Sequence, residues 1–473
     1  MGKTKPSTQK IRGKDLKNIQ YDSNRAKSLA IDIMSKHYKH ASKLEKLEVL
    51  IEVRKEPDNY LDDPILGILA EEFIEKDELK EKQEIQILKE SGDFKVYGRK
   101  LISSNAYQQM ELAMRLPITE KGALMPDAHQ GYGLPIGGAI ATKNAVIPYG
   151  VGVDIGCRMS LSLFDIEPDF MKRKSYQFKL ALQERTCFGS GGEVNVKQEH
   201  EVLDSAEFAS TPLLRQLHGK AVKQLGSSGS GNHFVEFGVV DLFDANEFGV
   251  EKGAYLGLLS HSGSRGLGAS IARFYTEIAK EQCPMPAHAQ HFAWLDLDTE
   301  EGAEYWLAMN LAGDYAKACH DQIHLHLSKY LGISPIAKVE NHHNFAWKEK
   351  GLTGEELIVH RKGATPAAKG ELGIIPGSMT AAGYIVRGKG EASSLFSASH
   401  GAGRKMSRSK ARQSYTGSEM RKVLSREGVT LIGGGVDEAP VAYKDLEEVM
   451  RYQQDLVETI GKFTPKIVRM DKR

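Results

Sequence analysis

Side chains that bind divalent metal ions recur in four short stretches of the chain, three of which contain glycines. Carboxylate, thiolate and imidazole are the ligand types that mid-row divalent ions accept. Taken singly, each residue fits equally well in a turn or as a buried, hydrogen-bonded side chain. Taken together, the set favours a metal site. Its members are an aspartate, a cysteine and four histidines: Asp154, Cys157, His233, His261, His342 and His343.

Cys157 has a property that the other candidate ligands lack. A thiolate sulfur has lone pairs to spare, so a single cysteine can bridge two cations held a few ångströms apart. A pair of metals suits phosphoryl chemistry, because one ion can orient a nucleophile while the other neutralises the developing charge. The residue types therefore allow a two-metal site centred on Cys157.

A fifth stretch, "SASHGAGRKMSRSKAR", places His400 between small residues and ahead of five Lys and Arg residues. His400 could be a metal ligand, a proton shuttle or a nucleophile. A neutral imidazole nitrogen can attack phosphorus, and Gly401 and Gly403 leave room for a nucleotide to approach. Arg404 and Arg408 could hold phosphate oxygens. The alternative is a turn of small residues with a solvated basic face.

The elements that must position these residues change along the chain. Residues 1–93 are charged and have helical periodicity, which predicts an accessory helical extension. Residues 94–473 carry β-branched, glycine-punctuated runs, which predict buried strands and tight turns. Helical periodicity returns at 304–332 and 441–461. We therefore expect an α+β fold, with one large domain of mixed β-sheets and flanking helices.

The charge of the chain is balanced overall but uneven locally. There are 63 Lys and Arg residues against 62 Asp and Glu residues, so any nucleic-acid partner must meet a local patch. Residues 361–422 carry a net charge of +9, and the rest of the chain carries −8. This segment is the predicted nucleic-acid-binding surface.

Cysteine usage and hydropathy indicate a cytoplasmic protein. The four cysteines are widely spaced and form no C-x-x-C pair, which is unlike a disulfide framework. The N-terminal sequence has no apolar signal region, and no apolar run approaches the ~20 residues of a membrane helix. We therefore expect no membrane partner.

Eight ordered blocks between about residues 95 and 445 carry a resemblance to a known family. They are "MPDAHQGYGLPIGG", "VGVDIGC", "GSGNHFVE", "HSGSRG", "HHNFAW", "RKGATPA", "GELGIIPGSM" and "SHGAGRKMSR". In this order they resemble the signature blocks of the RtcB family of RNA ligases. Residues 1–93 lie outside the resemblance.

The resemblance implies a role for each matching residue. His400 takes the position of the histidine that becomes linked to GMP, and Cys157 that of the bridging ligand. Asp127 and His129 would orient ligands. The implied ligands of two Mn²⁺ ions are Asp154, Cys157, His233, His261 and His343. The implied guanine-nucleotide contacts are Asn232, Glu236, Ser378, Gly401, Ala402, Gly403 and Arg404.

The implied reaction joins two RNA ends with GTP and Mn²⁺ as cofactors. His400 attacks the α-phosphate of GTP, and the resulting GMP passes to an RNA 3′-phosphate, formed where necessary by opening a 2′,3′-cyclic phosphate. A 5′-hydroxyl end then displaces GMP. Such ligation serves RNA repair or tRNA splicing.

Two departures from the family pattern indicate a divergent branch. Gly383 stands where the family has a nucleotide-contacting serine, and Met470 aligns with a lysine of the family's C-terminal tail, for which Lys472 could substitute only if the tail shifts. We therefore expect looser selectivity for GTP. Two alternatives remain: a metal-dependent cyclic phosphodiesterase that cannot ligate, and a non-catalytic RNA-binding module.

Overall fold

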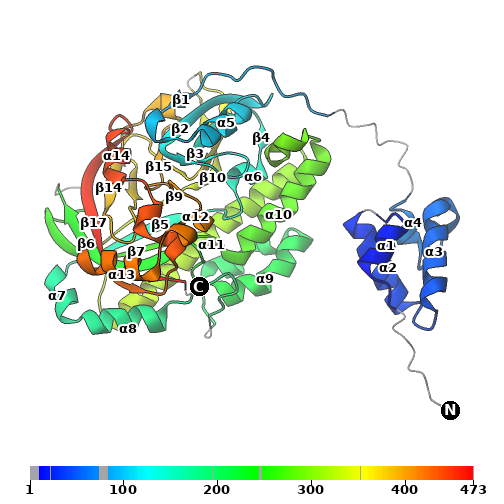
Figure 1. The fold of residues 1–473 in the computed structure, drawn as a ribbon, viewed down its shortest axis with the longest axis horizontal. Helices are drawn as coiled ribbons and strands as arrows, with labels where there is room; N and C mark the ends of the chain where they lie inside the picture. Colours follow the sequence, from blue (N-terminus) through cyan, green and yellow to red (C-terminus); the bar gives the residue numbers. More distant parts are fainter. Residues whose placement is uncertain are drawn as a thin grey trace, which may run out of the picture. The chain divides into compact units, whose positions relative to one another are not determined.

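The chain forms two compact units, residues 1–83 and 84–473, each with its own hydrophobic core (Figure 1). The computed structural model describes residues 10–21, 23–73, 84–194, 197–243, 248–351 and 353–471. In this part of the chain, no helix is both long enough and apolar enough to cross a membrane. The cytoplasmic location stays a prediction.

The smaller unit is a group of short helices held by capping and a shared core. Ser42 and Glu45 form a capping box at the start of α3, in which each side chain accepts a hydrogen bond from the other's backbone N–H. The buried Tyr21 donates its hydroxyl proton to the carbonyl of Leu50, 2.8 Å away. The helices are α1 (Gly13–Asn18), α2 (Asn24–Lys36), α3 (Lys43–Lys55), the 3-10 helix η1 (Pro57–Tyr60) and α4 (Gly67–Ala70).

The boundary of the larger unit lies ten residues before the one expected from composition. Ile85 donates its N–H to the carbonyl of Pro284 at 2.8 Å, and Leu88 donates to Arg115 at 2.9 Å. Residues 84–93 therefore pack with the larger unit.

The larger unit has an α+β fold whose main sheet contains eight strands. Its strands pair antiparallel in the order β13-β14-β17-β6-β7-β5-β9, and β16 joins β17 in parallel. The long β17 lies beside β6 in Figure 1. The strands are β5 (Arg158–Phe164), β6 (Phe234–Leu242), β7 (Gly253–Ser262), β9 (Ala337–His342), β13 (Leu372–Ile375), β14 (Gly383–Gly388), β16 (Thr430–Ile432) and β17 (Val457–Met470).

A second sheet contains five strands, one of which, β10, follows β9 in the chain. Its order is β1-β2-β3-β11-β10. Its strands are β1 (Lys95–Val96), β2 (Thr119–His129), β3 (Ile136–Thr142), β10 (Asn344–Lys350) and β11 (Glu356–Lys362). His343 is the single residue between β9 and β10, so the chain passes from the first sheet to the second at this histidine. Two small pairs complete the strands: β4 (Ala145–Val146) with β8 (Leu295–Asp296), and β12 (Ala364–Pro366) with β15 (Ser397–Ser399).

The longest described helix, α11, packs against the main sheet. The helix α11 runs from Glu300 to Leu331, with Thr299 as its N-cap and Gly332 in the left-handed conformation at its end, which confirms the helix predicted at 304–332. Its buried His320 and His324 place ring nitrogens 2.6 and 2.8 Å from the hydroxyl of Ser260 in β7.

The remaining helices of the larger unit flank the sheets (Figure 1). They are α5 (Ser104–Ala113), α6 (Pro148–Val151), α7 (Pro168–Arg173), α8 (Ser175–Arg185), α9 (Pro212–Gln224), α10 (Arg265–Gln282), α12 (Arg408–Ser414), α13 (Gly417–Arg426) and α14 (Leu446–Arg451). Seven 3-10 helices lie between the described elements: η2 (Arg99–Leu101), η3 (Glu201–Asp204), η4 (Ala206–Ala209), η5 (Ala287–Phe292), η6 (Ala392–Ser394), η7 (Val436–Glu438) and η8 (Pro440–Ala442).

The helix predicted at 441–461 is wrong over its last part. Helix α14 ends at Arg451, and β17 begins at Val457. Val457 pairs with Gly388 of β14, and Gly461 pairs with both β14 and β6. Pairing on both edges of the strand outweighs the local helical periodicity, as tertiary context often does.

Candidate active site

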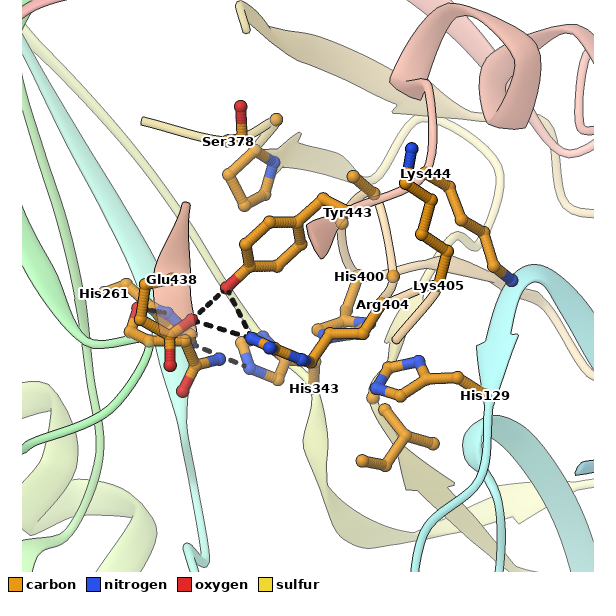
Figure 2. A pocket seen from close by; sticks show the side chains of 18 of the residues that line it. His129, His261, His343, Ser378, His400, Arg404, Lys405, Glu438, Tyr443 and Lys444 are labelled. Carbon is orange, nitrogen blue, oxygen red and sulfur yellow. Dashed lines mark hydrogen bonds and ion pairs between the residues drawn. The ribbon is translucent and has the colours of Figure 1, made fainter. Parts of the chain in front are cut away.

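One cavity of about 1370 Å³ is lined by every residue to which the family resemblance assigns a metal-binding, nucleotide-binding or nucleophilic role, and Figure 2 shows part of this lining. Its walls come from both sheets and from the segment after β15. The predicted residues among its lining are Asp154, Cys157, Asn232, His233, Glu236, His261, His343, Ser378, His400, Gly401, Ala402, Gly403 and Arg404. Residues up to 250 positions apart in sequence are thus brought to a single site.

The ends of four adjacent strands place the candidate metal ligands. Cys157 directly precedes β5, and His343 directly follows β9, the neighbour of β5 in the sheet. His261 lies near the end of β7 and pairs with Met159 of β5. His233 directly precedes β6, whose first residue also pairs with His261. Because these strands are antiparallel neighbours, their alternating starts and ends meet at one edge of the sheet.

The ligand atoms of these residues converge. The Sγ atom of Cys157 lies 3.4 Å from Nε2 of His233 and 3.2 Å from Nε2 of His261. Nε2 of His261 lies 3.3 Å from Nε2 of His343, an approach visible as a dashed line in Figure 2. Oδ2 of Asp154 lies 2.9 Å from Nε2 of His233.

The protonation of this cluster fits a bound cation. His261 lies with Nδ1 3.1 Å from the carbonyl of Asn232, so Nδ1 carries the proton and Nε2 presents a lone pair to the cluster. Burial lowers the pKa of His261 to about 3 and holds that of His343 well below its usual value, so both rings are neutral. The lone pair of His261 Nε2 faces Sγ of Cys157 and is available to bind a metal ion.

Cys157 also fits this interpretation. Burial, reinforced by the carboxylate of Asp154, raises the pKa of the Cys157 thiol well above its usual value. A coordinating cation deprotonates a thiol outright, so this buried cysteine would become a thiolate on binding metal. The donor set of carboxylate, thiolate and imidazoles therefore fits the divalent ions expected from the sequence.

His342 lies apart from the cluster, although it precedes His343 directly. Its ring packs 4.9 Å from the ring of Trp347 and 5.0 Å from that of Phe345, and it does not line the cavity. Successive side chains of an extended segment point to opposite faces. His343 therefore faces the cavity and His342 does not, and the ligand role of His343 stays a prediction.

His400 is held by a buried carboxylate. It follows β15, and its Nδ1 lies 2.7 Å from Oδ2 of Asp127, a fully buried residue of β2. Burial, the largest single influence, would raise the pKa of Asp127, but the charge and hydrogen bond of His400 together with the charges of Lys444 and His129 outweigh it and keep that pKa below its usual value. A carboxylate at Nδ1 fixes the tautomer and leaves Nε2 as the nitrogen available to a substrate. The ring of His400 lies 4.9 Å from that of His343.

The arginines after His400 are engaged by two acids that the sequence did not single out. Nη1 of Arg404 and Nε of Arg408 each lie 2.9 Å from a carboxylate oxygen of Glu438, which also accepts the hydroxyl proton of Tyr443 (Figure 2). Arg412 contacts Asp437 at 3.1 Å. The phosphate-holding roles of Arg404 and Arg408 stay predictions.

These pairs correct the expected RNA surface. The net charge of +9 was counted over 361–422 and left out Asp437 and Glu438, which lie fifteen residues further along. Arg361 is also fully buried and makes two hydrogen bonds to the carboxylate of Glu349. The accessible positive charge of the segment is therefore smaller than its sequence suggests.

Two lysines line the cavity although the sequence analysis assigned neither of them to the site. Lys444 donates to the carbonyls of Pro126 and Ala128, and burial lowers its pKa to about 8. Lys362 donates to the carbonyl of Tyr149 at 3.0 Å, and burial lowers its pKa to about 7. A lone lysine in a strand or loop is usually solvated, so only the three-dimensional structure identifies these two.

The departures from the family pattern also lie at the cavity. Gly383 lines it, and a Cβ atom at this position would meet Ile375 O and Pro376 Cα at 3.0 Å, which leaves little space for a larger residue. Met470 lines it as well and is buried. Lys472, the candidate substitute for the tail lysine, lies outside the described residues.

Comparisons with known proteins identify a single family. A family model described as "tRNA-splicing ligase RtcB" matches residues 108–471. The chain is 31% identical over 388 residues to the RNA-splicing ligase RtcB of Escherichia coli (strain K12), covering 76% of this chain and 92% of that protein. It is 31% identical over 434 residues to the tRNA-splicing ligase RtcB of Nanoarchaeum equitans, covering 76% and 90%. It is 30% identical over 442 residues to the RNA-splicing ligase RtcB homolog 2 of Entamoeba dispar, covering 77% and 83%.

Proposed function

This chain belongs to the RtcB family, and we propose that it is a metal-dependent RNA ligase that joins 3′-phosphate or 2′,3′-cyclic phosphate ends to 5′-hydroxyl ends with GTP. The observation that carries the proposal is the position of His400, whose Nδ1 is held by Asp127 beside a convergent set of metal ligands. A histidine fixed in this way is organised to act as a nucleophile and not as a ligand.

The first step forms a bond between Nε2 of His400 and the α-phosphorus of GTP, and pyrophosphate leaves. The carboxylate of Asp127 keeps the proton on Nδ1 and stabilises the positive charge that develops on the ring during attack. Two Mn²⁺ ions, held by Asp154, Cys157 and the three histidines of the cluster, would supply charge neutralisation at the phosphate oxygens.

Two further transfers complete the reaction. An oxygen of the RNA 3′-phosphate attacks the phosphorus of the histidine-bound GMP, and the bond to His400 breaks. The 5′-hydroxyl of the second end then attacks the 3′-phosphate and displaces GMP. We assign the guanine nucleotide to Asn232, Glu236 and Ser378, which line the same cavity as His400.

Labelling with radioactive GTP tests the nucleophile. Purified protein with Mn²⁺ should acquire an acid-labile, base-stable label, and His400→Ala should abolish it while keeping its metal. The same variant should still join a pre-guanylylated RNA end to a 5′-hydroxyl, because that substrate bypasses the histidine. The exposed His288 provides the matched control, since His288→Ala should label normally. Label that persists on His400→Ala would contradict the assignment.

A second function is favoured by the changes at the nucleotide end of the cavity. With Gly383 and Met470 in place of the expected serine and lysine, the site could open cyclic phosphates without ligating. Protein that hydrolyses a 2′,3′-cyclic phosphate end with Mn²⁺ but never acquires a GMP label would establish this function in place of ligation. If the protein is a ligase, we propose that it acts in RNA repair or tRNA splicing.

A further inference from the structure

An exposed aromatic ring stands at the cavity, in the loop that joins β2 to β3. Tyr132 lines the cavity, yet 71% of its surface is exposed to solvent. Neither the metal cluster nor the nucleophile uses it. An aromatic side chain with its face in water at the edge of a binding cavity offers a stacking surface to a flat ligand.

The loop that carries this ring is fixed at several points. Gln109 of α5 donates to the carbonyl of Gly131 at 2.6 Å and accepts the N–H of Gly131 at 3.1 Å. Nζ of Lys362 donates to the carbonyl of Tyr132 itself. The ring lies edge-on to His291, with 6.0 Å between the ring centroids. The exposed ring is thus presented by an anchored backbone, so little ordering is required when a ligand binds.

The cavity is larger than one nucleotide requires. Its volume of about 1370 Å³ exceeds the roughly 300 to 1,000 Å³ typical of small-molecule sites. Polar groups share the cavity with the ring: Lys100, Asn105 and Gln130 line it, and Gln130 lies two residues before Tyr132 in the same loop. Asn105 and Gln130 also contact each other at 3.2 Å. A cation and amides beside an exposed ring match the backbone and base of a nucleotide.

We propose that Tyr132 binds the nucleobase of an RNA end by stacking, and so forms a base site distinct from the guanine-nucleotide site. The inference rests on the proposed function, because it assumes that RNA ends enter this cavity. Every base has a π-face, so the site would accept any terminal nucleotide and would not select a sequence. The ring would hold either the 3′-phosphate end or the 5′-hydroxyl end.

Binding of short RNAs with 2-aminopurine as the terminal base tests the proposal in the full chain. Stacking on Tyr132 should quench the fluorescence, and Tyr132→Ala should relieve the quenching and weaken binding roughly 5- to 150-fold. Tyr132→Trp should restore binding. Tyr176 is a matched control, because it is 73% exposed and does not line the cavity. Circular dichroism and metal content verify that each variant is folded.

Separate oligonucleotides with a 3′-phosphate and with a 5′-hydroxyl terminus identify the end that stacks. The end that carries the stacked base should bind Tyr132→Ala more weakly than the unchanged protein. Removing the terminal base of that oligonucleotide should then cause no further loss of affinity for Tyr132→Ala. Affinity within twofold of the unchanged protein for both ends would overturn the inference. The proposed function fails by a different result, the absence of GMP label on the unchanged protein.

Discussion

Replacement of Asp127 by asparagine separates the electrostatic role of this residue from its packing. Asp127 is fully buried, Oδ2 lies 2.7 Å from Nδ1 of His400, and Oδ1 has no hydrogen-bond partner among the described residues. Asparagine has the same shape but no charge. Its amide could also donate to Nδ1, which would place the ring proton on Nε2 and remove the lone pair needed for attack.

The magnitude of this effect can be bounded from the distance. Two unit charges 2.7 Å apart at an effective dielectric constant of about 20 interact by about 6 kcal/mol, which limits the loss to about 10⁴-fold. Replacing a charged hydrogen bond by a neutral one costs about 1 to 1.5 kcal/mol, which sets a floor of about tenfold. We expect Asp127→Asn to slow GMP labelling of His400 by about 10²-fold, between these limits.

Single-turnover labelling with radioactive GTP measures this rate directly. Metal content should stay unchanged in Asp127→Asn, because Asp127 is not among the converging ligands. Ligation of a pre-guanylylated RNA end should be affected much less than labelling, since the nucleophile has already acted. A labelling rate within threefold of that of the unchanged protein would refute the proposed role of Asp127.

Three further predictions follow from the same cavity. Cys157→Ala should lose bound metal in elemental analysis, whereas Cys283→Ala, which alters a buried apolar position, should retain it. Burial lowers the pKa of Lys362 to about 7, so the folded protein binds fewer protons than the unfolded chain between pH 7 and the ordinary lysine pKa. We therefore compare the free energy of unfolding of the unchanged protein with that of Lys362→Met, both measured by thermal unfolding. The difference should rise in favour of the unchanged protein by at most about 2.7 kcal/mol from pH 7 to pH 9 and should stay constant below pH 6. Gly383→Ser should sharpen the preference for GTP over ATP several-fold in competition labelling, because one neutral hydrogen bond contributes about 0.5 to 1.5 kcal/mol. The new Cβ would lie 3.0 Å from Ile375 O and Pro376 Cα, so thermal unfolding must first show that the variant is as stable as the unchanged protein. In such a variant, an unchanged ratio would mean that position 383 does not contact the base.

The sequence could predict the candidate site because its members occur in local motifs of special composition. Cys157, His233 and His261 each adjoin a strand end, where a glycine-bearing turn brings the ligand to the edge of the sheet. The family resemblance selected His343 over His342, and side-chain alternation along the extended segment explains why only one of the two faces the cavity. Such inferences depend on only a few neighbouring residues. Here the pairing of the strands places these local motifs side by side.

The fold was predictable for the same reason where one local pattern dominated. Helix α11 has matching signals at both ends, Thr299 as the N-cap and Gly332 in the left-handed conformation. The segment after Arg451 has helical periodicity as well, but β14 pairs with one of its edges from Val457 onward and β6 pairs with the other from Gly461 onward. The sequence of a strand does not show which strands it pairs with. The competition between helix and strand after Arg451 is therefore decided only in the folded chain.

Electrostatics was the least predictable level, because charge acts through space. Arg404, Arg408 and Arg412 of the 361–422 segment gather around Asp437 and Glu438, which are almost fully buried at 2% exposure. Removing either acid would leave unpaired cations beside the cavity, and a buried carboxylate without its arginines would be strongly disfavoured. The arginines and acids therefore stabilise one another and shape the wall of the site. The cations free to meet RNA phosphates must be sought among lysines that line the cavity without an acidic partner there, of which Lys405 is the nearest in sequence to the nucleophile.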